Sequence, residues 1–177
     1  MSSGGELLVR AARVRLLLTD VDGVWTDGRL TWHEDGRDSA CFHVHDGYGM
    51  QRLRRAGVAV AVVSGRDSPA VRSRFEFLGV DALVLGTLEK GPPARSIRES
   101  LGLAPEEVAA MGDDLPDLAL FDEAGLCFAP PGAVPEVRAR ADLVTRAPAG
   151  AGALREVCDL ILRARGVDPA EAFGGKP

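Results

Sequence analysis

Short, nearly unbroken hydrophobic runs recur along the chain, and segments with a helix-like pattern separate them. The first run covers residues 14–19 and is almost entirely apolar, which is typical of a strand buried on both faces. Four later runs share this pattern, at residues 58–63, 82–85, 108–111 and 125–128. Such runs alternating with helices predict right-handed βαβ units and therefore a parallel sheet.

The segments between and after these runs predict helices at residues 47–56, 68–78, 91–101, 115–122, 134–139 and 151–165. We therefore expect an α/β fold, a Rossmann-like doubly wound parallel sheet with helices on both faces. The length of 177 residues suits one domain over residues 1–177. Residues 1–8 and 168–177 are expected to be loosely held ends.

Residues 25–45 interrupt the alternation and predict a β-hairpin. Two β-prone runs, residues 29–33 and 39–43, flank Glu34-Asp35-Gly36-Arg37, and Asp-Gly between such runs is a strong hairpin signal. This hairpin is too small to be a separate cap domain. A short hairpin has little core of its own, so we expect contacts with other subunits from its aromatic residues, Trp25, Trp32 and Phe42.

Two aspartates follow the first hydrophobic run directly. Asp20 and Asp22 precede Gly23 at the carboxyl end of the predicted strand, where open α/β sheets place their ligands. Two nearby carboxylates repel each other, and a divalent cation such as Mg²⁺ removes that repulsion. Asp and Gly are also common in solvated turns, so this motif alone leaves both interpretations open.

Three later strands end in polar residues too, namely Ser64, Lys90 and Asp113. The carboxyl ends of parallel strands share one edge of the sheet, so these side chains are expected to converge with the two aspartates. Each residue alone has a simpler interpretation, because serine often caps a helix, lysine is usually solvated and Gly-Asp-Asp often forms a turn. Their combination in this order favours an active site.

Composition narrows the possible functions. The net charge of -5 argues against broad nucleic-acid binding. No apolar run approaches the ~20 residues of a membrane span, and the N-terminus lacks the apolar core of a signal peptide. Cys41, Cys127 and Cys158 lack CxxC spacing, which indicates reduced thiols. We expect a cytoplasmic protein with neither a nucleic-acid nor a membrane partner.

The four polar motifs together resemble those of the haloacid dehalogenase superfamily: Asp-Val-Asp-Gly-Val at 20–24, Ser-Gly at 64–65, Lys90, and Gly-Asp-Asp-Leu-Pro-Asp at 112–117. The resemblance covers residues 13–165. It is most specific to the small, capless 3-deoxy-D-manno-octulosonate 8-phosphate (KDO 8-phosphate) phosphatases, through the segments at 19–28, 46–50, 64–66, 141–145 and 154–160. The phosphatase domains attached to some acylneuraminate cytidylyltransferases are also similar.

This resemblance implies a Mg²⁺-dependent hydrolase of phosphate monoesters. Asp20 would be the nucleophile that forms an aspartyl-phosphate, and Asp22 would be the general acid and then the general base. Ser64, the Gly65 amide and Lys90 would bind the phosphoryl oxygens.

The implied metal ligands are the Asp20 side chain, the Asp22 backbone carbonyl and the Asp113 side chain. Asp114 and Asp117 would position metal-bound water or Lys90. The resemblance also implies a homotetramer, in which hairpins form a central barrel and one hairpin helps to cover a neighbour's site.

Substrate contacts in this family match a segment and two arginines here, in addition to the phosphate-binding residues. The candidate substrate-binding residues are therefore Asp22, His43, Val44, His45, Asp46, Gly47, Gly65, Arg66, Arg74 and Lys90. Arginine can pair bidentately with the carboxylate of a sugar acid. Three arginines of the family are absent, because this chain has His45, Gln51 and Ala151 at those positions.

We therefore keep several substrates and functions open. KDO 8-phosphate is the first candidate, followed by 3-deoxy-nonulosonate or N-acylneuraminate 9-phosphate and by a broader range of sugar phosphates. A non-catalytic domain that oligomerises a partner cytidylyltransferase is a further alternative. A scaffold has no need for all of the retained polar residues, namely Asp20, Asp22, Ser64, Lys90 and Asp113.

Overall fold

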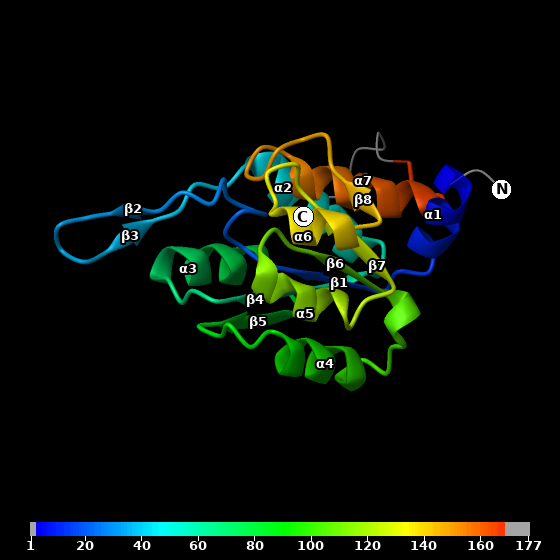
Figure 1. The fold of residues 1–177 in the computed structure, drawn as a ribbon, viewed down its shortest axis with the longest axis horizontal. Helices are drawn as coiled ribbons and strands as arrows, with labels where there is room; N and C mark the ends of the chain where they lie inside the picture. Colours follow the sequence, from blue (N-terminus) through cyan, green and yellow to red (C-terminus); the bar gives the residue numbers. More distant parts are fainter. Residues whose placement is uncertain (1–2, 169–177) are drawn as a thin grey trace.

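A six-stranded parallel sheet forms the centre of the protein in a computed structural model that describes residues 3–168 (Figure 1). Neighbouring strands pair in the order β5-β4-β1-β6-β7-β8. Their bounds are β1 Leu16–Thr19, β4 Ala59–Ser64, β5 Ala82–Leu85, β6 Val108–Met111, β7 Leu126–Ala129 and β8 Leu143–Val144. The five predicted strands are confirmed within one or two residues at their ends, and β8 is an additional edge strand.

Helices cover both faces of the sheet, as predicted. One face packs against α1 Ser3–Ala11, α2 Val44–Arg55, α3 Pro69–Leu78 and α7 Ala153–Ala164. The other packs against α4 Gly91–Ser100, α5 Leu118–Phe121 and α6 Pro135–Arg140. The predicted helix at 115–122 is a 3₁₀ turn, η2 Leu115–Asp117, followed by the short α5, and a second 3₁₀ turn, η1 Pro105–Glu107, precedes β6.

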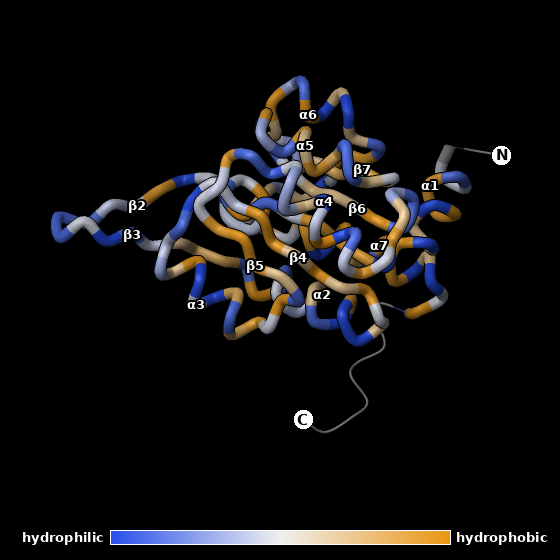
Figure 2. The backbone as a smooth tube through the Cα atoms, turned by 90° about the horizontal axis from the view of Figure 1, so that it is seen from below, coloured by the Kyte–Doolittle hydropathy of each residue, from blue (hydrophilic) through white to orange (hydrophobic). Residues whose placement is uncertain are grey.

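Strand β1 shows why its sequence is continuously apolar. Leu17 points into the core under α2 and α7, whereas Leu16 and Leu18 point into the core under α4 and α5. All residues of β1 are buried, so neither face of the strand tolerates alternating polar residues. The hydrophobic colouring of the inner strands in Figure 2 follows from this double burial.

The N-terminal segment departs from prediction. Residues 3–11 form α1, which contacts α7, and Leu7 packs against the core. The Arg10 guanidinium pairs with Asp142 at 2.7 Å and donates to the carbonyl of Gly125. The prediction of a loosely held end is therefore wrong for residues 3–8, while residues 1–2 and 169–177 lie outside the described part.

The predicted hairpin is confirmed and extends away from the body (Figure 1). Its strands β2 Thr31–Trp32 and β3 Asp38–Ser39 are antiparallel, and Gly36 takes a positive φ of 78° in the turn. Among the described residues, no helix has the length and apolar character needed to cross a membrane.

The aromatic residues of this segment do not behave alike. Trp25 is buried and Phe42 is half-buried, and both rings meet Phe75 edge to face, at 4.9 and 5.8 Å between centroids. The expectation of contact with other subunits is wrong for Trp25, because its ring is covered within the chain. For Phe42, which keeps part of its surface exposed, it stays a prediction. Trp32, in contrast, is 66% exposed on the hairpin.

Candidate active site

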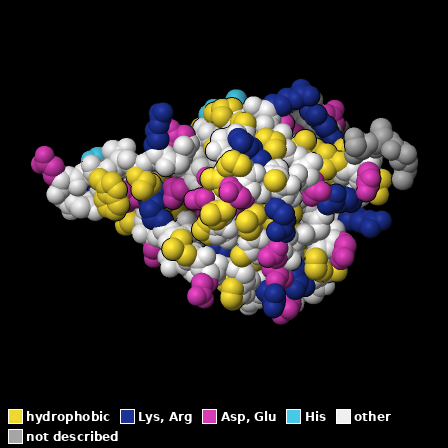
Figure 3. All heavy atoms as spheres, viewed as in Figure 1, with side chains coloured by type: hydrophobic (Ala, Val, Ile, Leu, Met, Phe, Trp, Pro, Cys, Tyr) yellow, Lys and Arg dark blue, Asp and Glu magenta, His cyan; other side chains and the backbone are white. Residues whose placement is uncertain are grey.

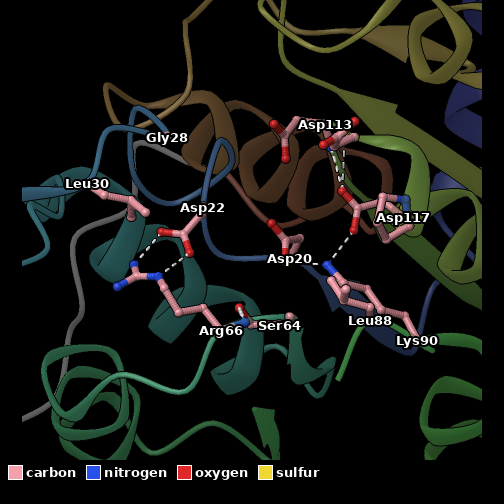
Figure 4. A pocket seen from close by; sticks show the side chains of 13 residues that line it. Asp20, Asp22, Gly28, Leu30, Ser64, Arg66, Leu88, Lys90, Asp113 and Asp117 are labelled. Atoms are coloured by element: carbon pink, nitrogen blue, oxygen red, sulfur yellow. Dashed lines mark hydrogen bonds and ion pairs between the residues drawn. The ribbon is translucent and has the colours of Figure 1, made fainter. Parts of the chain in front are cut away.

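A cavity of about 380 Å³ opens at the carboxyl ends of β1, β4 and β6 (Figure 4). All five polar residues expected to converge there line it: Asp20, Asp22, Ser64, Lys90 and Asp113. Gly65, Arg66, Asp114 and Asp117 also line it, as do four residues outside the prediction, Gly28, Leu30, Leu88 and Pro116. Figure 3 shows acidic side chains gathered near the base of the hairpin, with hydrophobic side chains beside them.

A lysine held between two carboxylates forms the floor of the cavity. Lys90 lies at the start of α4, and its Nζ is 2.5 Å from Asp20 Oδ1 and 2.6 Å from Asp117 Oδ1. All three side chains are at most 8% exposed. Burial alone lowers the pKa of Lys90, but the charges of Asp20 and Asp117 outweigh it and the pKa is raised. Lys90 therefore supplies a fixed positive charge beside Asp20.

The pKa values of two carboxylates at this site are raised as well, which for an acid favours the uncharged form. Burial, followed by the charge of Asp117, raises the pKa of Asp20 to about 7. Burial and the charge of Asp20 likewise raise the pKa of Asp113 to about 7. One lysine does not neutralise this group of acids, so the site favours a further cation.

The surroundings of Asp113 fit a metal ion. Its Oδ1 is buried and has no hydrogen-bond partner among the described residues. Carboxylate oxygens of Asp20, Asp113 and Asp117 lie within 4.8 Å of one another. Gly23 has φ +85° and its Cα lies against Asp113, so a β-carbon at that position would overlap the carboxylate. Oxygen donors around an unpartnered carboxylate suit Mg²⁺.

Asp117 is engaged elsewhere. Its Oδ2 accepts from the backbone N–H groups of Asp113 and Asp114, at 2.8 and 3.1 Å, and its Oδ1 accepts from Lys90. Asp114 caps η2 by accepting from the N–H of Leu115. These contacts match the expectation that Asp117 positions Lys90, and they leave Asp20 and Asp113 as the side chains available to a cation.

Asp22 lies across the cavity and is paired with an arginine (Figure 4). Arg66 donates from Nε to Asp22 Oδ2 at 2.8 Å and from Nη2 to Asp22 Oδ1 at 2.6 Å. Its Nη1 donates to Asp38 on β3. Ser64 is buried nearby and accepts from the Arg66 N–H at 3.3 Å.

Most of the predicted substrate segment lies outside the cavity of its own chain. His43 caps α2, while Val44 and His45 are exposed at its first turn. Asp46 is buried and accepts from the N–H groups of Gly152 and Arg155, which fastens α2 to the start of α7.

The two remaining candidates meet each other. Gly47 packs against the guanidinium of Arg74, and a β-carbon at this position would require the end of that side chain to shift. The Arg74 Nε is buried without a hydrogen-bond partner among the described residues. Of the predicted substrate-binding residues, those lining this chain's cavity are Asp22, Gly65, Arg66 and Lys90.

Comparison with known proteins identifies the family. The model of haloacid dehalogenase-like hydrolases matches residues 86–156. The chain is 40% identical over 161 residues to the 3-deoxy-D-manno-octulosonate 8-phosphate phosphatase KdsC of Escherichia coli, covering 91% of this chain and 86% of that protein. The chain belongs to the KDO 8-phosphate phosphatase family of haloacid dehalogenase-like hydrolases.

Solved structures of KDO 8-phosphate phosphatases share the fold. The Moraxella catarrhalis enzyme, in complex with magnesium, phosphate and KDO, has a TM-score of 0.88 and 35% identity, over 92% of this chain and 93% of that one. The cobalt-bound Haemophilus influenzae enzyme has a TM-score of 0.86 and 40% identity, over 89% and 92%. This chain is accordingly a phosphoric monoester hydrolase of the same family.

Sequence reasoning missed the hydrophobic rim and one carboxylate. Leu30 and Leu88 lie far apart in the chain, and no periodicity relates them to the strand ends. Asp38 belongs to a predicted hairpin, but a two-residue strand gives no pattern that shows which of its side chains turns toward the body. The contact between Asp38 and Arg66 therefore appears only in three dimensions.

Proposed function

We propose that this chain is a Mg²⁺-dependent phosphatase that hydrolyses the phosphate monoester of a 2-keto-3-deoxy sugar acid, with KDO 8-phosphate as the first candidate. The observation that carries the proposal is the convergence of Asp20, Lys90 and Asp113 in one cavity, with Asp22 opposite them. The names of the family relatives support the choice of substrate.

Asp20 is the proposed nucleophile. A carboxylate oxygen of Asp20 attacks phosphorus, the bond between phosphorus and the ester oxygen breaks, and an aspartyl-phosphate forms. Lys90, Ser64 and the Gly65 amide are proposed to hydrogen-bond the phosphoryl oxygens, with Lys90 adding positive charge where negative charge accumulates.

Asp22 is the proposed acid and base. It gives a proton to the departing sugar oxygen, and then takes a proton from the water that attacks the aspartyl-phosphate. That second step releases inorganic phosphate and restores Asp20. In the structure Asp22 is paired with Arg66, so this contact is rearranged when Asp22 binds its proton.

The side chains of Asp20 and Asp113, with the backbone carbonyl of Asp22, are the proposed Mg²⁺ ligands. When bound, the ion supplies positive charge that offsets the repulsion between the aspartates and an anionic phosphate ester. The unpartnered Oδ1 of Asp113 and the raised pKa values of Asp20 and Asp113 support this assignment.

Recognition of the sugar acid is proposed to involve Arg66 within the cavity and the segment 43–47, with Arg74, from a neighbouring subunit. The exposure of Val44, at 71%, is consistent with contact across an interface. A homotetramer is proposed, because Trp32 and Leu30 expose apolar area on a projecting hairpin while Leu88, at the cavity, is 72% exposed. The three free thiols suit a cytoplasmic location.

A nine-carbon sugar acid 9-phosphate is the second candidate. The observation that favours it is the loss of three family arginines at His45, Gln51 and Ala151, each of which is at least partly exposed. Fewer cations at these positions would alter recognition of the sugar without changing the hydrolytic residues.

The test is kcat/KM over a panel that contains KDO 8-phosphate, 3-deoxy-nonulosonate 9-phosphate, N-acetylneuraminate 9-phosphate, glucose 6-phosphate and p-nitrophenyl phosphate. We expect a sugar acid phosphate to exceed glucose 6-phosphate by about tenfold or more, the value of one charge-assisted contact. EDTA should abolish turnover and Mg²⁺ should restore it. An equal kcat/KM for sugar phosphates with and without a carboxylate, or full activity in metal-free buffer, would contradict the proposal.

A further inference from the structure

A buried carboxylate connects the hairpin to the candidate active site. Asp38 on β3 has a side chain that is only 8% exposed. Its Oδ2 accepts from Arg66 Nη1 and its Oδ1 accepts from Ser68 Oγ at 2.9 Å. A buried carboxylate needs such partners, and both come from the loop after β4.

Arg66 bridges two carboxylates through different edges of its guanidinium. The edge formed by Nε and Nη2 faces Asp22, whereas Nη1 faces Asp38. Arginine presents its donors in a rigid plane, so fixing Nη1 on Asp38 also fixes the direction of the other edge. The Arg66 side chain is 18% exposed and lines the cavity together with Asp22.

We propose that Asp38 is a positioning residue that anchors Arg66 through Nη1, so that the Asp22-facing edge of Arg66 keeps its place while Asp22 exchanges partners during catalysis. This inference rests on the proposed function. It joins the hairpin to the acid–base step, since Asp38 belongs to β3 and Asp22 is the proposed proton donor. Without Asp38, Asp22 is the one carboxylate among the described residues that still holds the Arg66 guanidinium, so an anion that enters the cavity can displace it.

The test compares Asp38→Asn with Asp35→Asn, a matched change in the same hairpin. Asp35 is 49% exposed and pairs with the exposed Arg37 outside the cavity. For a sugar acid phosphate, we expect Asp38→Asn to lower kcat about tenfold, the size of one lost charge-assisted hydrogen bond, with a smaller change in KM. Asp35→Asn should stay within about twofold of wild type. Asp38→Glu, which restores the carboxylate, should recover part of kcat.

A second substrate separates positioning from general damage to the fold. p-Nitrophenolate is a good leaving group that needs little protonation, so hydrolysis of p-nitrophenyl phosphate by Asp38→Asn should fall by about twofold or less. An equal fall for both substrates, or no fall for the sugar acid phosphate, would overturn the role of Asp38.

The contact between Asp38 and Arg66 can be measured independently of turnover. The Nε–H signal of Arg66 in ¹⁵N NMR spectra should broaden or exchange faster in Asp38→Asn and stay unchanged in Asp35→Asn. An unchanged signal in Asp38→Asn would overturn the anchor. If wild type hydrolyses no sugar acid phosphate while the signal still changes, the proposed function fails and the anchoring of Arg66 stands.

Discussion

The floor of the cavity and the first turn of α2 both carry residues that the family resemblance marks as functional, but they place them in opposite surroundings. On the floor, Asp20 and Lys90 are almost fully buried and are bonded to each other within one chain. At the start of α2, Val44 and His45 are exposed and lie outside the cavity of their own chain.

The difference follows from the cost of burying charge. A buried carboxylate without a partner is strongly unfavourable, so the floor is stable only when its charges are placed against each other and against a cation. An exposed side chain at the start of α2 carries no such free-energy cost, so replacing it should have little effect on stability. The proposed hydrolytic residues therefore lie within one chain, whereas the proposed substrate contacts at the start of α2 lie on an exposed surface.

The largest loss of activity is expected when the proposed nucleophile on the cavity floor is replaced. Asp20→Asn should lower turnover at least about 10³-fold, because a neutral amide does not form the acyl-phosphate. Steady-state rates with p-nitrophenyl phosphate and a sugar acid phosphate measure this. Wild-type rates in the purified variant would show that Asp20 is not the nucleophile.

The fold of this variant provides the control. Burial raises the pKa of Asp20 to about 7, so above that pH the ionised carboxylate disfavours the folded state, and this penalty is absent below its unfolded pKa. Asparagine carries no charge at any pH. In metal-free buffer at pH 8 the Tm of Asp20→Asn should be no lower than that of wild type, and a much lower Tm would mean that lost activity reflects unfolding.

The same contrast explains what could be predicted from the sequence. Strand β1 and the cavity residues at its end were predictable, because double burial leaves a continuous apolar run and parallel strands end at one edge. The placement of Trp25 was not, since its partner Phe75 lies on α3, about fifty residues later in the chain. The Asp38–Arg66 contact was not predictable for the same reason, because it depends on how the hairpin leaves the body.

The first turn of α2 is proposed to act in a neighbour's site, so its role is tested most directly by separating the subunits at the hairpin. Trp32→Ser should weaken self-association about 30-fold or more, since a buried tryptophan at an interface often contributes at least about 2 kcal/mol. Light scattering should show a smaller species than wild type, and activity should fall with dilution if a neighbour completes the site. Val9→Ser is the matched control, because Val9 is 52% exposed on α1, at the opposite end from the hairpin. If the wild-type protein is a fully active monomer, both the proposed tetramer and the proposed shared site are refuted.

The smallest expected effect concerns the surface that selects the sugar. If His45, Gln51 and Ala151 mark a shifted specificity, then KDO 8-phosphate is a poor substrate of wild type, and His45→Arg/Gln51→Arg/Ala151→Arg should raise its kcat/KM about tenfold, the value of one productive charge-assisted contact. Hydrolysis of p-nitrophenyl phosphate should change little, because the cavity floor is untouched. These positions lie outside the cavity of their own chain, so the gain should disappear when Trp32→Ser is added and subunits separate. A gain that survives separation would place the arginines at their own chain's site, and efficient turnover of KDO 8-phosphate by wild type with no gain in the variant would make the three replacements neutral.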